Sequence, residues 1–451
     1  MLKKTDTDMT QGSIIKQLLS FALPMVVGLL FQVLYNTVDT LVVGKFVSKQ
    51  ALAAVGCNSS IINTIVGAFA GLATGASVVI SQAYGARDDE RLSKAVHTTM
   101  TLTFILSAIG TVLGLVLARP LLNLTNTPED VMDDAMTYLL IYFAGVTGAL
   151  VYNMGSGILR AVGDSRRPVI FLIVSAITNI VLDLAFVLLF KMGVDGVALA
   201  TIIAEFVSAV LVVLTLMRSD AAYGLKLKKL SIDKSIIKRT LELGLPSSIQ
   251  TAVTSFSNVF VQAYINNLGT DAMAGWSAYN KLDSFLTVPL TAISMASTTF
   301  AGQCWGAKLK KRCREGTNKA LLLALAITAF LSVFIVIFAK QMLMIFTNKE
   351  DEKVIEYGTY FIRWITPFYC CICFNQIYSG TLRGIGNAIM PTVIMLSSFV
   401  VFRQIYLYVF VKVLSCGQLV ITLAYPIGWI LCSTLLTICY RRSELYKGEI
   451  Q

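Results

Sequence analysis

Twelve long runs of mostly apolar residues follow one another along the chain, separated by short polar segments. Each run holds about 20 residues or more, which is enough to cross the roughly 30 Å hydrocarbon core of a bilayer as a helix. A transmembrane β-barrel would instead show segments of about 10 residues with alternating polarity. The pattern predicts an all-α polytopic membrane protein with twelve transmembrane helices, over residues 16–44, 52–82, 95–118, 134–159, 168–190, 195–217, 240–266, 272–303, 318–339, 354–382, 391–413 and 418–440.

The second half of the chain repeats the first. Three segments recur at offsets of 221 to 223 residues: "SQAYGA" (81–86) as "GQCWGA" (302–307), "SGILRAVGDSRRP" (156–168) as "SGTLRGIGNAIMP" (379–391), and "ALPMVVG" (22–28) as "GLPSSIQ" (244–250). This spacing predicts duplication of a six-helix unit, and an even number of helices keeps both copies in one orientation, as a parallel 6+6 repeat of two six-helix bundles. We expect an N-lobe over 1–218 (helices 1–6), a cytoplasmic linker over 219–239, and a C-lobe over 240–451 (helices 7–12).

Composition and charge agree with a membrane location. Hydrophobic residues make up 56% of the chain and charged residues 14%, whereas about 25% of residues are charged in a typical soluble domain. The net charge is +11, and 26 of the 37 Lys and Arg fall on one side of the membrane when the N-terminus is cytoplasmic. This distribution follows the positive-inside rule. It predicts a multi-pass protein of the cell membrane with both termini cytoplasmic, no cleavable signal peptide and no nucleic-acid partner.

The sequence offers no convincing pattern for catalysis or for a structural metal. Cys370, Cys371 and Cys373 lie in an apolar run without His or acidic partners, so we interpret them as small buried hydrophobes. His97, the single histidine, falls at a helix end. We therefore expect a protein that is not an enzyme and has no cofactor, that is a monomer, and whose main partner is the lipid bilayer.

Polar residues share one face of several helices in the first half. The sets are Gln32, Tyr35, Asn36 and Asp39 in helix 1, Ser175, Asn179 and Asp183 in helix 5, and Thr201 with Glu205 in helix 6, while Asn153 lies in helix 4. Spacings of three, four and seven residues bring side chains to the same helical face. Because these faces are too polar for lipid, we expect the helices to turn them toward one another inside the first bundle.

The two aspartates are costly in this position, since an acid at the centre of a membrane helix costs about 2.5–3.5 kcal/mol. In the second half the equivalents of Asp39 and Asp183 are Val261 and Tyr406, so we expect buried acids in the N-terminal half alone. A packing role would need them in both copies, so the asymmetry favours function. The oxygens could bind Na⁺, or a proton where two carboxylates resist double ionisation. The alternatives are interhelical hydrogen bonds of about 0.6 kcal/mol each and, for Glu205, simple contact with water.

Pro24 lies 15 residues before Asp39 in helix 1. Proline removes a backbone hydrogen bond and can kink a helix. We predict a hinge here that couples the charge state of Asp39 to the shape of a substrate cleft between the two halves, whose rocking is the expected motion. A static kink is the alternative.

Four motifs resemble those of the MATE (multidrug and toxin extrusion) transporters: "ALP" opening helix 1, "QAYGA" after helix 2, "LRAVGD" after helix 4 and "LRGIGN" after helix 10. The resemblance covers nearly the whole chain, and its specificity comes from the order and spacing of the motifs. "VDTLVVG" in helix 1 and "TNIVLD" in helix 5 resemble the DinF-type branch, whose helix 1 aspartate is the cation-coupling acid. The NorM-type branch relies on an acid in helix 7, and helix 7 of this chain, "TAVTSFSNVFVQAYI", has none.

The resemblance implies a secondary active multidrug efflux transporter that works by alternating access. Such antiporters export small, bulky, amphipathic and often cationic compounds in exchange for H⁺ or Na⁺. The resemblance makes Asp39 the coupling residue. The remaining coupling residues would be Asp183, Asn179, Asn153, Thr201 and Asn36, with Glu205, Tyr35 and Gln32 as secondary members.

Aromatic side chains could form surfaces for organic cations in the cleft, with packing as the alternative. The candidates are Phe31, Tyr35, Phe256, Phe260, Trp276 and Tyr279. Arg403 lies deep in helix 11. If it faces the cleft it favours anionic or zwitterionic substrates, and if it pairs with an acid or snorkels it carries no information on the substrate.

The alternative functions are a lipid-precursor flippase and an intramembrane aspartyl protease. A flippase for a lipid-linked precursor, from the same superfamily, would usually have extra helices and a basic central cavity. An intramembrane aspartyl protease needs a Gly-x-Gly-Asp helix, and the nearest match, "AVGD" at 161–164, lacks the first glycine and falls in a predicted cytoplasmic turn.

Overall fold

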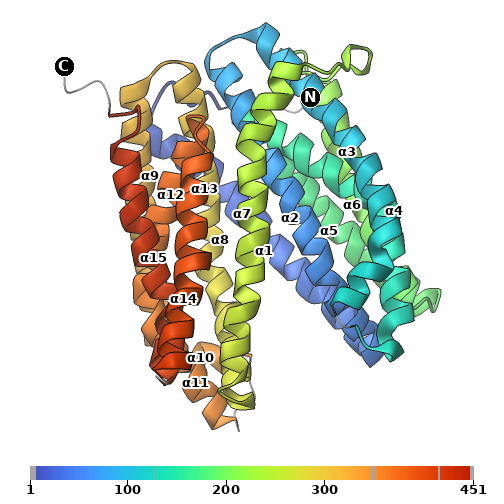
Figure 1. Cartoon of the computed structure of the whole chain (residues 1–451). Helices are drawn as coiled ribbons and strands as arrows, with labels where there is room; N and C mark the ends of the chain where they lie inside the picture. The colour runs from blue at the N-terminus through green and yellow to red at the C-terminus, as the bar shows by residue number, and fades with distance from the viewer. Residues whose placement is uncertain (1–6, 126, 347–350, 415–416, 447–451) are drawn as a thin grey trace. The chain divides into compact units, whose positions relative to one another are not determined.

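The structure is a computed structural model that describes residues 7–125, 127–346, 351–414 and 417–446. These residues form helices joined by short connections, with no strand among them. The first half contains α1 (Ile14–Phe46), α2 (Lys49–Gly85), α3 (Asp89–Leu124), α4 (Glu129–Ala161), α5 (Arg166–Leu184) with its π-helical continuation η1 (Ala185–Leu189), and α6 (Val194–Met217) (Figure 1).

The second half follows the same plan with more interruptions. After the short turn η2 (Leu227–Lys229) come α7 (Lys234–Asn266), α8 (Thr270–Gly306), α9 (Lys310–Ile337), α10 (Ala339–Leu343), α11 (Glu352–Ile365), η3 (Thr366–Phe368), α12 (Tyr369–Gly384), α13 (Ile389–Leu396), η4 (Ser397–Phe402), α14 (Arg403–Leu407), η5 (Tyr408–Val413) and α15 (Gln418–Arg441). The segments α13 to η5 form one continuous predicted span, 391–413.

Ten spans within the described residues are long and apolar enough to cross a membrane. The other two predicted spans are α7, which carries many hydroxyl and amide side chains, and the pair α11 and α12, which Pro367 interrupts at η3. Proline lacks the N–H that would continue the helix. The predicted all-α fold with twelve spans is therefore confirmed, with its tenth span broken into two helices.

The chain divides into two compact units, which we call the first and the second unit. The first contains Leu23–Ser248 and the chain up to Asp8, and the second contains Met9–Ala22 and the chain from Ile249. The predicted boundaries, 1–218, 219–239 and 240–451, differ from this division. The start of α1 belongs to the second unit and the start of α7 to the first. The boundary between the units within each of these helices lies within three residues of a proline, Pro24 in α1 and Pro246 in α7.

The predicted linker packs within the first unit. The backbone N–H of Lys226 donates to Nε2 of His97 at 3.0 Å, and that of Asp233 donates to Oγ1 of Thr98 at 3.2 Å. His97 is 2% exposed. The single histidine therefore has a structural role as an anchor for the linker.

Glycines allow α2 to approach the start of α7 closely in the first unit. A Cβ atom on Gly75 would lie 2.5 Å from both the amide nitrogen of Gly244 and the carbonyl oxygen of Thr240. One turn away, Oγ of Ser248 donates to the carbonyl of Ala68. Small residues that let backbones touch are a common basis of helix association in membranes.

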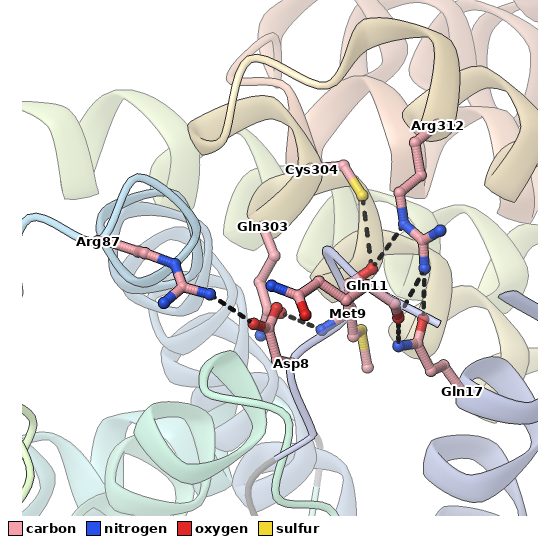
Figure 2. A network of polar contacts seen from close by, with 8 residues as sticks. All are labelled: Asp8, Met9, Gln11, Gln17, Arg87, Gln303, Cys304 and Arg312. Carbon is pink, nitrogen blue, oxygen red and sulfur yellow. Dashed lines mark hydrogen bonds and ion pairs between the residues drawn. The ribbon is translucent and has the colours of Figure 1, made fainter. Parts of the chain in front are cut away.

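The N-terminal segment is held by side chains in both units (Figure 2). In the first unit, Asp8 forms an ion pair with Arg87 at 3.1 Å. In the second unit, Met9 is fully buried and its N–H donates to Gln303 Oε1 at 2.9 Å. Arg312 donates at 2.9–3.0 Å to the carbonyl oxygens of Met9, Gln11 and Gly12 and to Oε1 of Gln17.

We expect the substitution Arg312→Lys to release this segment, because a lysine ammonium cannot reproduce the forked donors of a guanidinium. Limited proteolysis of the detergent-solubilised protein should cut the N-terminal segment about 10-fold faster, which corresponds to the loss of about 1.4 kcal/mol of local stability. The matched control is Lys311→Ala, at an exposed neighbouring residue, for which cleavage should not change. Equal cleavage of both variants would contradict the role of Arg312.

Candidate functional site

A cavity of about 380 Å³ lies inside the first unit, among α1, α2, α4, α5 and α6. Nearly all the predicted coupling residues meet there. Those that line the cavity are Gln32, Tyr35, Asp39, Asn153, Asn179, Thr201 and Glu205. The side chain of Asn36 lies outside the described part of the structure, and Asp183 is fully buried beside the cavity.

Close helix contacts hold these side chains in place. Oγ of Ser175 on α5 donates to the carbonyl of Ala204 on α6 at 2.7 Å. On α4, Gly148 has no side chain between its backbone and that of Glu205, since a Cβ there would be 3.1 Å from the Glu205 carbonyl carbon. The glycine therefore brings α6 near enough to α4 for Glu205 to reach the cavity.

Asp39 and Asp183 form the centre of the site. Their carboxyl groups lie close together, and Asp183 has 0% exposed surface. Oδ1 of Asp39 and both oxygens of Asp183 are buried without a hydrogen-bond donor among the described residues. Since two ionised carboxylates cannot donate to each other and repel at short range, a proton or a metal cation between the oxygens would stabilise this pair.

Neutral oxygen ligands surround the acid pair. Asn179 is 2% exposed, and neither atom of its amide has a partner among the described residues. The amide nitrogen of Asn153 donates to the carbonyl oxygen of Ala149 at 2.8 Å, so the amide oxygen of Asn153 is left as an acceptor. Thr201 donates to the carbonyl oxygen of Val197 at 3.0 Å, and its hydroxyl oxygen has a second lone pair with which it can accept. Carboxylate, amide and hydroxyl oxygens are the ligands that hard cations prefer.

Several tyrosines on α4 belong to the site and were not predicted. Tyr138, Tyr142 and Tyr152 line the cavity, and the hydroxyl of Tyr142 donates to Oε1 of Glu205 at 3.3 Å. Tyr138 and Tyr142 are four residues apart, which is one helical face. The signal was present in the sequence, but tyrosine in an apolar run is ordinary and does not stand out as an aspartate does.

The electrostatic character of the cavity is acidic. The described residues that line it include Asp39 and Glu205 and no Lys, Arg or His. Within the described residues, no three His, Cys, Asp or Glu side chains come together as a metal-binding group.

The predicted aromatic surface is only partly accessible. Phe31, Phe256 and Phe260 are 38%, 64% and 49% exposed, whereas Trp276 and Tyr279 are 5% and 4% exposed. Trp276 and Tyr279 belong to the core of the second unit, where their rings pack 4.9 Å apart. The structure therefore favours the packing role for Trp276 and Tyr279 over a role as a surface for substrate, because their rings already contact other side chains.

Arg403 is buried in the second unit at 3% exposure. Its Nη2 donates to Oγ of Ser257 and to Oδ1 of Asn258, both at 2.8 Å, and its guanidinium lies 4.8 Å from the ring centre of Tyr425. No carboxylate within 4.0 Å pairs with it in the described residues. Neutral oxygens and the face of an aromatic ring thus stabilise the charge of Arg403. Neither a side chain exposed in a cleft nor an ion pair with an acid, two of the expected arrangements, is found for Arg403 among the described residues.

We expect Asn258→Ala to destabilise the protein, because it takes an acceptor from a buried cation. The cost should be about 1–3 kcal/mol in the free energy of unfolding. Thermal denaturation in detergent measures it as a lower midpoint. The control is Asn267→Ala, at an exposed position on the same chain segment; a loss of the same size there would contradict the assignment.

Buried acids are not confined to the first half, contrary to the sequence prediction. Asp283 on α8 is partly buried, and its Oδ1 accepts a hydrogen bond from the hydroxyl of Tyr279 at 3.3 Å. That hydroxyl also lies 3.2 Å from the hydroxyl of Tyr369. Asp283 has no acidic counterpart in the first half, so the equivalents of Asp39 and Asp183 do not reveal it.

Comparison with known proteins decides the family. The MatE family model matches residues 24–185 and again residues 246–409, once in each half. The chain belongs to the MATE family. It is 29% identical to the "Probable multidrug resistance protein YpnP" of Bacillus subtilis, covering 96% of each chain, and 30% identical to YoeA of the same organism, covering 85% of this chain and 84% of that protein.

Solved structures of MATE transporters share the fold. One described as the outward-facing conformation of a multidrug resistance MATE family transporter superposes with a TM-score of 0.91 at 25% identity, covering 99% of this chain and all of the other. A Pyrococcus furiosus MOP superfamily transporter superposes with a TM-score of 0.90 at 24% identity, covering 98% of each chain. This MATE chain is therefore a multi-pass membrane transporter and not an enzyme.

Proposed function

We propose that this MATE chain exports small amphipathic cations in exchange for H⁺ or Na⁺, with Asp39 and Asp183 as the coupling pair. The observation that carries the proposal is the buried acid pair in the first unit, whose facing oxygens have no donor among the described residues. A charge in hydrocarbon must be neutralised or paired. A mobile cation can do so here, since the described residues that line the cavity include no basic side chain.

The cation can drive transport only if it binds the two transport states with different affinity. In the proposed cycle, H⁺ or Na⁺ enters the pair from the outside and favours the conformation that releases the drug outward. The cation then leaves toward the cytoplasm, where the drug binds. Pro24 is the proposed hinge in α1, since it lies inside this helix between Asp39 and Ala22, the last residue of α1 that belongs to the second unit.

The relatives support efflux as the direction and drugs as the substrates. YpnP, YoeA and a Thermotoga maritima protein that is 27% identical are all named probable multidrug resistance proteins. A Shewanella oneidensis relative, 23% identical, is named FAD transporter, so anionic substrates are the main alternative. The acidic lining of the cavity supports cations for this chain, and it argues against a lipid-precursor flippase with a basic cavity. We further propose a monomer in the cell membrane with both termini cytoplasmic.

The test uses purified protein in liposomes, with a pH gradient and a Na⁺ gradient imposed separately. A panel of cationic dyes and anionic dyes of similar size is loaded inside or outside. We expect one of the two gradients to drive cationic dyes against their concentration gradient. Movement of anionic dyes alone, or no response to either gradient, would contradict the proposal.

A further inference from the structure

The cavity contains a third acid that the proposed coupling pair does not use. Glu205 on α6 lines the cavity; its Oε1 accepts from Tyr142 at 3.3 Å, and its Oε2 is buried with no partner among the described residues. A single long donor satisfies little of an ionised carboxylate, which has about four acceptor positions. Glu205 therefore also needs a proton or a cation when the cavity is closed to bulk water.

Glu205 is separate from the acid pair. Asp39 interacts with Asp183, whereas Glu205 has Tyr142 as its partner on α4. Glu205 and the aspartate pair therefore have different partners.

The groups that face Glu205 supply no fixed positive charge. They are Tyr138 and Tyr142 from α4 and Tyr35 from α1. None of these side chains carries a positive charge, so none of them can neutralise the carboxylate of Glu205.

The cavity has room for two occupied positions. Its volume of about 380 Å³ compares with the roughly 30 Å³ that a water molecule occupies in the liquid. Asn179 lines the cavity and is 2% exposed, and neither atom of its amide has a partner among the described residues. These unpaired amide atoms are a further indication that the cavity binds a polar ligand or ion.

We propose that Glu205 is a second cation-binding residue, so that each transport cycle moves two H⁺ or Na⁺ inward for each substrate. The inference rests on the proposed function, since it assigns a stoichiometry to the same site. One cation binds the Asp39–Asp183 pair and the other binds Glu205. Both leave together when the site opens to the cytoplasm.

The steady-state accumulation of substrate measures this stoichiometry. In liposomes with the membrane potential clamped at zero, a tenfold gradient of the coupling ion supports an accumulation ratio of about 10-fold for one ion and about 100-fold for two, at 1.4 kcal/mol per tenfold step. The probe is radiolabelled ethidium, a monovalent cation. The ratio is independent of transport rate, so a variant that is merely damaged reaches the same ratio more slowly.

We expect a ratio of about 100-fold for the wild type, for Glu205→Asp and for the exposed control Asp133→Asn, and of about 10-fold for Glu205→Gln. If Glu205→Gln does not fold, the wild-type ratio alone decides between one and two ions. A wild-type ratio of about 10-fold, or equal ratios for wild type and Glu205→Gln, would overturn the second cation site and leave the proposed function intact. Failure of any gradient to move ethidium in the wild type would overturn both.

Discussion

The substitution Asp39→Asn should abolish gradient-driven efflux while the protein stays folded. The amide keeps the shape of the side chain but can neither bind a proton at neutral pH nor attract Na⁺ with a full charge. Moving a two-state equilibrium from 1:99 to 99:1 requires about a 10⁴-fold difference in affinity between the states. Without the charge of Asp39 that difference is lost, and we expect the efflux rate in liposomes to fall by at least about 100-fold.

Two further variants show whether the loss belongs to the coupling pair. Asp183→Asn should have a similar effect, because it removes the second carboxylate of the same pair. Asp133→Asn, at an exposed position near the start of α4, should transport at the wild-type rate. Thermal denaturation of each variant in detergent separates loss of function from loss of folding. Efflux by Asp39→Asn at the wild-type rate would remove the basis of the proposed mechanism.

The substitution Gly75→Ala should cause a large loss of stability. Its Cβ would lie 2.5 Å from the backbone of α7 at both Gly244 and Thr240, so the two helices would have to move apart. Overpacking of this kind costs about 1–3 kcal/mol and sometimes more. We expect a clearly lower thermal midpoint in detergent and poor yield of folded protein.

Gly56→Ala provides the matched control on the same helix. A Cβ at Gly56 meets nothing within 4 Å, and replacing a mid-helix glycine by alanine stabilises a helix by roughly 0.5–1 kcal/mol. The two variants should therefore shift the thermal midpoint in opposite directions. Equal shifts would mean that helix propensity, and not the contact between α2 and α7, governs position 75.

Local sequence patterns predicted the membrane spans and most of the site. The apolar runs determine which segments can enter a bilayer, and the polar positions in helix 1 gave the correct face of α1, since Gln32, Tyr35 and Asp39 all line the cavity. The pattern failed where the polar signal was weak. Tyr142 and Asp283 passed as ordinary residues of apolar helices, although both make hydrogen bonds that involve a carboxyl group and a tyrosine hydroxyl.

Arg403 shows why some questions lie beyond sequence. Its depth in helix 11 was visible, but its partners, Ser257 and Asn258, come from a helix about 145 residues earlier. No local pattern encodes such a contact. The same holds for Trp276, whose burial depends on Phe361 and Tyr425 of other helices.

By itself, the sequence determined that this chain is a duplicated twelve-helix membrane protein with acids where lipid would not tolerate them, because length, periodicity and polarity are properties of each helix alone. Only the tertiary structure decided that Asp39 lies close to Asp183 and that Glu205 has Tyr142 as its partner. It also decided that the start of α1 belongs to the second unit and the start of α7 to the first. These features depend on how each helix is rotated about its axis and which neighbour it meets. Side chains far apart in the chain fix that choice through packing.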